Sequence, residues 1–183
     1  MSSSNFAPSI VPNMKTRFLF SLAVLAVAAL GFATAEEVDL SAHKVTHVTW
    51  GDAIEGDERP AFKKEELNGK VVVVEEFGVK IPDCLSRIKD LSRLAKKHAR
   101  DASPLAIVMI HRQREVPDKE ILEAIERVPP SVIVRKNGFL PVYHEGMPNA
   151  AVFGADGEMV WTGDPSNAAF GRALKAALKK AGK

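Results

Sequence analysis

The only cysteine of this chain, Cys84, is the side chain best suited to nucleophilic or redox chemistry. It closes the segment Phe77–Cys84, which directly follows the apolar run Val71–Val74. A thiol near the start of a helix gains acidity from the helix dipole and from nearby cations such as Lys80, whereas burial opposes ionisation. A lone cysteine cannot form an intramolecular disulfide, so exchange within a pair of cysteines is excluded.

Two carboxylates, Glu75 and Glu76, stand between the apolar run and the cysteine segment. Successive side chains of a strand point to opposite faces of its sheet, so at least one of these acids is expected to be partly buried. A buried carboxyl has a raised pKa and is a candidate proton acceptor. The alternative is that both are polar residues at a fraying strand end.

The elements around these residues follow from periodicity and from turn chemistry. Val71–Val74 and Leu105–Ile110 are continuous apolar runs typical of buried parallel strands. Pro82 suits the first turn of a helix, and Asp156-Gly157 predicts a hairpin turn. The full expected order is strand, helix from Pro82, strand, helix from Pro117, strand at 132–134, strand at 150–153, strand at 159–162, and a last helix from Asp164. This order predicts an α/β sandwich.

The N-terminal region carries an export pattern. A basic start at 14–17 precedes an apolar stretch over 18–32 and a small-residue cleavage pattern at 33–35. We interpret residues 1–35 as a signal peptide with Met14 as the true start; an uncleaved anchor is the alternative. Residues 36–60 are expected to be an extension with an edge strand at 36–50, and residues 61–183 the main domain.

Removal of residues 1–35 would remove Lys15 and Arg17 and no acids, which leaves 23 basic and 23 acidic side chains. A neutral mature chain gives no support for nucleic-acid binding. We expect a periplasmic or secreted monomer with no stable membrane insertion after cleavage, no cofactor and no metal. His43 and His47 are four residues apart, but no third ligand is near them.

Four segments resemble the thioredoxin superfamily, in particular the exported TlpA-like redoxins of the AhpC/TSA type. They are the strand entry at 68–74, the segment Phe77–Cys84, the Gly146–Pro148 turn and the hairpin at 153–163. The resemblance covers about 50–181. It implies a three-layer α/β/α sandwich with a mixed central sheet.

The resemblance also implies roles for individual residues. Ile81 stands where these proteins carry the first, attacking cysteine, so the Ile-Pro-Asp-Cys motif is degenerate. Glu75 matches a buried acid that exchanges protons with the second cysteine, here Cys84. Pro148 matches a cis-proline beside the thiols. Phe77, Ile81 and Met147 would then contact a bound substrate.

Two functions remain open at this point. The first is a redox-related or partner-binding protein without dithiol oxidoreductase activity. The second is a monothiol oxidoreductase or peroxide-reactive redoxin that uses Cys84 with Glu75 and Pro148, and whose partner is a protein or peptide thiol or disulfide. The peroxidase branch of the superfamily carries a threonine and a proline where this chain has Ile81 and Phe77, so its peroxide pocket is not reproduced.

Overall fold

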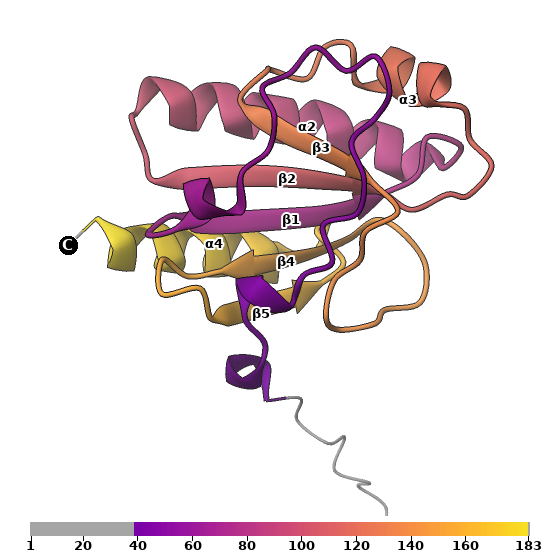
Figure 1. Cartoon of the computed structure of the whole chain (residues 1–183). Coiled ribbons are helices and arrows are strands. Elements are labelled where there is room, and N and C mark those ends of the chain that lie inside the picture. Colours follow the sequence, from indigo (N-terminus) through magenta and orange to yellow (C-terminus); the bar gives the residue numbers. More distant parts are fainter. Residues whose placement is uncertain (1–38, 183) are drawn as a thin grey trace, which may run out of the picture. The chain divides into compact units, whose positions relative to one another are not determined.

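The computed structural model describes residues 39–182, and the predicted signal peptide lies outside these residues. The described chain belongs to a unit that begins at Asp39. Its elements in order are η1 (Leu40–Ala42), η2 (Val45–His47), η3 (Lys64–Leu67), β1 (Val71–Phe77), α2 (Pro82–Arg100), β2 (Leu105–His111), α3 (Asp118–Ile125), β3 (Val132–Lys136), β4 (Asn149–Phe153), β5 (Met159–Gly163) and α4 (Ala168–Ala181), where η marks a 3-10 helix (Figure 1).

The sheet is mixed and has the strand order β3-β2-β1-β4-β5. Strand β1 pairs in parallel with β2, with Val74 opposite Val108, and antiparallel with β4, with Val74 opposite Ala151. All seven residues of β1 are buried, as the continuous apolar run predicts for a strand covered on both faces. The α/β architecture expected from the element order and the mixed sheet implied by the resemblance are both confirmed.

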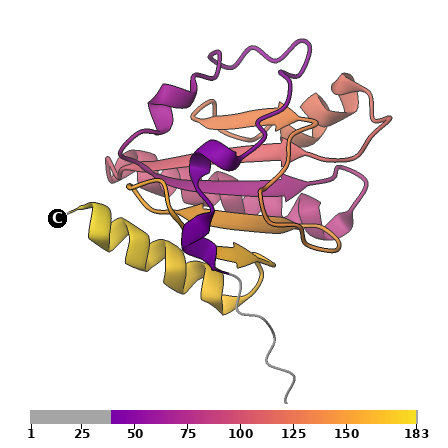
Figure 2. The same ribbon diagram turned by 60° about the horizontal axis from the view of Figure 1, so that its bottom comes forward.

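The two faces of the sheet are covered by different kinds of structure. One face packs against α2, α3 and α4 through Ile88, Ile121 and Phe170, among others. The other face is covered by residues 39–70, here called the N-terminal segment, and by the loop after β3. The segment contributes Trp50 and the loop contributes Leu140. Figure 2 shows the N-terminal segment and α4 on opposite sides of the sheet. The outer layer opposite the α-helices therefore consists of 3-10 helices and loops.

Helix α2 begins as its sequence predicts. Pro82 occupies the first turn, where its missing N–H costs no hydrogen bond, and Ile81 is the N-cap residue. The side chains that face the sheet recur at helical spacing, and the buried ones are Cys84, Ile88, Leu91, Ser92 and Ala95. This amphipathic pattern fixes which side of the helix faces the core and therefore directs Cys84 inward.

The edge strand expected at 36–50 is wrong for the described part, residues 39–50. Two short 3-10 helices, η1 and η2, occupy half of this stretch, and strand pairing is limited to isolated bridges at Lys44 and Thr49. Local hydrogen bonds compete with strand pairing here, because Asp39 accepts from the Ser41 N–H and His47 Nδ1 accepts from the Lys44 N–H. Only Val48 and Trp50 show the expected alternation, since both are buried while Thr49 is exposed.

The last helix begins at Ala168, four residues after the expected start at Asp164. Asp164 accepts a hydrogen bond from the Ser166 N–H and so stabilises a turn. Asn167 is the actual N-cap, because its side chain accepts from the Ala169 N–H at 2.9 Å. Both residue types are good caps, and the second one starts the helix.

The N-terminal segment is attached to the sheet where two glycines cross. Gly51 has φ of +66°, and a Cβ there would overlap the Lys136 carbonyl oxygen. A Cβ at Gly138 would overlap the Thr49 carbonyl oxygen. The close approach permits backbone pairing, since the Thr49 and Phe139 N–H groups each donate to the other's carbonyl at 3.0 and 2.8 Å.

We expect Gly138→Ala to lower the free energy of unfolding by about 2–3 kcal/mol, because backbone cannot yield to an added methyl group as a side chain can. Chemical denaturation measures this change. The matched control is Gly171→Ala on α4, where an added Cβ meets nothing within 4 Å. That variant should gain about 0.5–1 kcal/mol from helix propensity. Equal effects of the two substitutions would contradict the crossing as the cause.

Candidate functional site

The predicted site residues meet at the edge of the sheet that is formed by strand ends, not by an outermost strand. The carboxyl ends of the parallel strands β1 and β2 lie there, with Phe77 opposite His111. Strand β4 runs the other way, and its first residue, Asn149, lies opposite Glu76. Pro148 therefore lies at the same edge as Phe77, from which the chain turns into α2. The Met147–Pro148 peptide bond is cis.

The Cys84 thiol is buried at this edge. Cys84 and Phe77 belong to the core on the helix side of the sheet, and both are essentially inaccessible to solvent, with exposures of 0% and 1%. Ile81 and Met147 are partly buried and pack against the same core. The structure thus brings together four of the six residues predicted for the site in one apolar cluster.

The surroundings of Cys84 disfavour its thiolate. Burial raises the pKa of the Cys84 thiol above its ordinary value. A backbone hydrogen bond with Gly78 opposes this rise, and the nearby carboxylates of Glu75 and Asp83 add to it. Since the thiolate is the nucleophile, both the burial and the charges reduce the reactivity of Cys84.

Glu75 lies on the same face of β1 as Phe77, and its exposure is 1%. The Arg87 guanidinium binds both carboxylate oxygens, with Nη2 at 2.9 Å from Oε2 and Nε at 3.3 Å from Oε1. Arg87 lies on α2 one turn after Cys84, and it also stacks over the Phe170 ring at 5.4 Å. Burial raises the pKa of the Glu75 carboxyl, and the Arg87 hydrogen bonds partly counteract that rise.

Glu76 points to the opposite face and is also buried, with 7% exposure. Its Oε1 accepts a hydrogen bond from the Leu140 N–H at 3.0 Å and lies 3.2 Å from Arg112 Nη1. Arg112 Nη1 also donates to the Gly138 carbonyl. The expectation that at least one of the two acids is buried is therefore confirmed, and in fact both are.

The turn between β1 and α2 packs against residues at and just after the end of β2. Gln113 Oε1 accepts from the Lys80 N–H at 2.8 Å, and its side chain occupies the space that a Cβ at Gly78 would need. His111 is buried against Phe77 at a ring separation of 5.3 Å, and its Nε2 meets no partner among the described residues. Burial lowers the pKa of His111, which favours the neutral imidazole.

Three supporting residues, Arg87, His111 and Gln113, were not predicted as site residues. The position of Arg87, three residues after Cys84 on the inward side of the helix, is the signal that could have identified it. His111 ends an apolar strand, and the sequence does not show what it contacts. Among residues 39–182 no group of three or more His, Cys, Asp or Glu side chains is arranged to hold a metal.

A surface pocket of about 470 Å³ opens next to Met147. We call it the Met147 pocket; the residues used below are Glu76, Arg112, Phe139, Tyr143 and Met147. The Phe139 and Tyr143 side chains are 48% and 80% exposed. The Arg112 guanidinium lies 5.7 Å from the Phe139 ring centroid. Its ion pair with Glu76 contributes charged groups to the lining of the pocket.

Comparisons with known proteins identify the fold. No protein-family model matches the chain, and no curated protein matches it. Among solved structures, a thiol-disulfide isomerase from Corynebacterium glutamicum has a TM-score of 0.57 and 18% identity over 72% of this chain and 95% of its own. A thioredoxin-family thiol:disulfide interchange protein from Chlorobium tepidum has a TM-score of 0.54 and 23% identity over 72% and 93%. A secreted thiol-disulfide isomerase from C. glutamicum has a TM-score of 0.54 and 13% identity over 73% and 83%.

These similarities establish a thioredoxin-like α/β fold, as the four sequence segments predicted. At these identities they concern the fold alone. Within residues 39–182, no helix combines the length and the hydropathy required to cross a membrane.

We expect Arg87→Met to lower the free energy of unfolding by about 3–5 kcal/mol, because it leaves the Glu75 carboxylate buried without a counter-charge. The loss should be larger at pH 8 than at pH 5. Without Arg87, the folded-state pKa of Glu75 rises further above its unfolded value. Arg87→Met is therefore most stable at pH values below the pKa that Glu75 has in the unfolded chain. It loses stability as the pH rises toward the higher pKa that Glu75 has in the folded protein.

Denaturation of Arg87→Met at several pH values measures this effect. In the double variant Arg87→Met/Glu75→Gln, the additional loss at high pH should disappear. Arg93→Met is the matched control, since Arg93 is exposed and, among residues 39–182, pairs only with Asp90. A pH-independent loss in Arg87→Met would contradict the role of the Glu75 charge.

Proposed function

We propose that this chain is an exported thioredoxin-fold protein that binds polypeptide partners and lacks dithiol oxidoreductase activity. The observation that carries the proposal is the complete burial of Cys84, the only thiol. Ile81, which has no reactive group, is the N-cap residue of α2, and the resemblance to the thioredoxin superfamily implies that redox-active members carry their attacking cysteine at this position. Export is proposed from the basic, apolar and small-residue pattern of residues 14–35.

The Met147 pocket supports a binding role at the same edge. Four large apolar side chains are exposed among the described residues, and two of them, Phe139 and Tyr143, line this pocket. Aromatic residues and methionine are enriched in the cores of protein interfaces, because they bury much area and adapt to their partner. The ligand that fits this surface is an extended polypeptide with apolar side chains.

The pocket also offers polar contacts to such a ligand. Arg112 retains exposure of about a third of its side chain while it pairs with Glu76. Its remaining donors are available to carbonyl groups of a bound backbone. Phe77 and Ile81 are then structural in this proposal, and Met147 links the core around Cys84 to the binding surface.

The first experiment measures the alkylation of Cys84 by a maleimide in the native protein. We expect a rate roughly a hundredfold or more below that of the variant Ile81→Cys/Cys84→Ser, whose thiol would lie at the helix start, because alkylation of a buried thiol requires local opening. In denaturant the two proteins should react alike. Fast alkylation of Cys84 with a thiolate pKa below about 8.5 would establish the monothiol oxidoreductase instead.

The second experiment titrates the mature protein with fluorescent, reduced and carboxymethylated α-lactalbumin, an unfolded chain without free thiols. We expect Phe139→Ser and Tyr143→Ser each to weaken binding by about tenfold or more. Val160→Ser is the matched control, because Val160 is similarly exposed, at 44%, but lies on β5 away from the pocket. Binding that is absent, or that all three substitutions leave unchanged, would overturn this site.

A further inference from the structure

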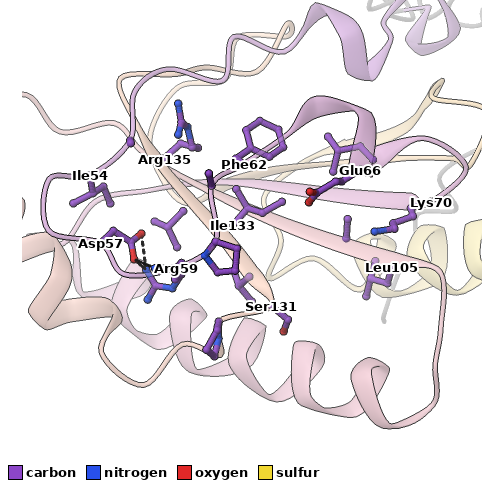
Figure 3. A pocket seen from close by; sticks show the side chains of 18 residues that line it. Ile54, Asp57, Arg59, Phe62, Glu66, Lys70, Leu105, Ser131, Ile133 and Arg135 are labelled. Carbon is purple, nitrogen blue, oxygen red and sulfur yellow. Dashed lines mark hydrogen bonds and ion pairs between the residues drawn. The ribbon is translucent and has the colours of Figure 1, made fainter.

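A second pocket, of about 470 Å³, lies beside the edge strand β3, away from the Cys84 turn. We call it the edge pocket; it lies between the segment 53–70 and strands β2 and β3. Figure 3 shows the side chains of Ile54, Phe62, Ile133 and Arg135 around this space. The segment pairs with β3 only at its start, where Asp52 and Lys136 exchange two backbone hydrogen bonds, and then separates from the strand.

Arg135 is the unusual residue of this pocket. Its Nη2 donates to the Gly51 carbonyl at 2.7 Å, and its guanidinium lies 5.8 Å from the Phe62 ring centroid. Its Nε is buried and meets no hydrogen-bond acceptor among the described residues. Arg135 forms no ion pair with any acid of the described residues.

The other charges of the pocket do not compensate Arg135. Asp57 and Arg59 bind each other at 3.0 Å (Figure 3). Arg59 also donates to the Ile125 carbonyl. Glu66 and Lys70 are both exposed and offset one another in charge. The charged side chains that line the pocket therefore carry a net charge of one cation, which is Arg135.

The rest of the lining is largely apolar. Ile133 and Leu105 come from the strands, and Phe62 and Leu67 from the covering segment. A volume of this size lies within the range of small-molecule sites, which combine an apolar lining with a few polar groups that orient the ligand. The combination favours a ligand with one anionic group and an aliphatic body.

We propose that the edge pocket binds a small aliphatic carboxylate, with the carboxylate on Arg135 and the chain against Ile133 and Leu105. A carboxylate supplies the counter-charge that Arg135 lacks, and a charge-assisted hydrogen bond to a guanidinium is among the stronger polar contacts in proteins. The aliphatic body gains the free energy of burial on the apolar lining. Phe62 holds the guanidinium in place through its ring face.

The test is a titration of the protein of residues 36–183 with sodium octanoate, followed by NMR of the Arg135 side-chain Nε–H and by calorimetry. We expect the Nε–H resonance to shift on saturation. Octanamide, which has the same body without the charge, should bind about tenfold more weakly or worse. Acetate, which lacks the body, should cause no saturable shift at the same concentrations.

Three variants make the outcome decisive. Arg135→Met should weaken octanoate binding about tenfold or more and should leave octanamide binding nearly unchanged. Ser131→Phe, which changes an exposed lining residue and leaves Arg135 intact, should weaken both ligands by filling the pocket. Lys70→Met, which removes the exposed cation, should change octanoate affinity less than Arg135→Met does. Equal affinity for octanoate and octanamide, or octanoate binding without a shift at Arg135, would overturn the proposal.

Discussion

The structure depends on how two adjacent carboxylates are accommodated in the most buried strand. Glu75 and Glu76 lie on opposite faces of β1, both buried, and each pairs with one arginine. A buried carboxylate without a counter-charge costs several kcal/mol, so these contacts constrain the surrounding elements. Arg87 couples α2 to the sheet on one face, and Arg112 couples the loop after β3 to it on the other. Both pairs lie at the edge that carries the candidate site.

This arrangement accounts for the state of the thiol. The side of α2 that brings Arg87 to Glu75 also brings Cys84 into the core, because residues three apart on a helix share a face. The carboxylate and the apolar cluster then both disfavour a thiolate at Cys84. The exposed aromatic side chains at this edge are Phe139 and Tyr143 of the Met147 pocket. In the function that we propose, the loop after β3 therefore carries recognition and the cysteine turn is structural.

The unequal covering of the sheet has a further consequence. All three helices α2–α4 pack on one face, so the other depends on an irregular segment for its cover. That segment is held to β3 by the crossing of Gly51 and Gly138 and then leaves the strand. An irregular chain does not follow the sheet surface as a helix would, and a pocket remains between the two. Arg135, anchored at Gly51, lies where this separation begins.

The sequence by itself determined the elements whose signals are local. The apolar run at Val71–Val74 and the proline at the start of α2 predicted a strand and a helix, because burial and backbone geometry act within a few residues. It failed at 39–50, where local capping contacts leave only isolated bridges at Lys44 and Thr49 in place of a strand, and it did not identify Arg135. Only the tertiary structure decided which distant groups meet, such as Leu140 with Glu76, 64 residues apart, and Arg135 with Gly51, 84 apart. Such contacts are set by the strand order and by the packing of the covering segment, which no local pattern encodes.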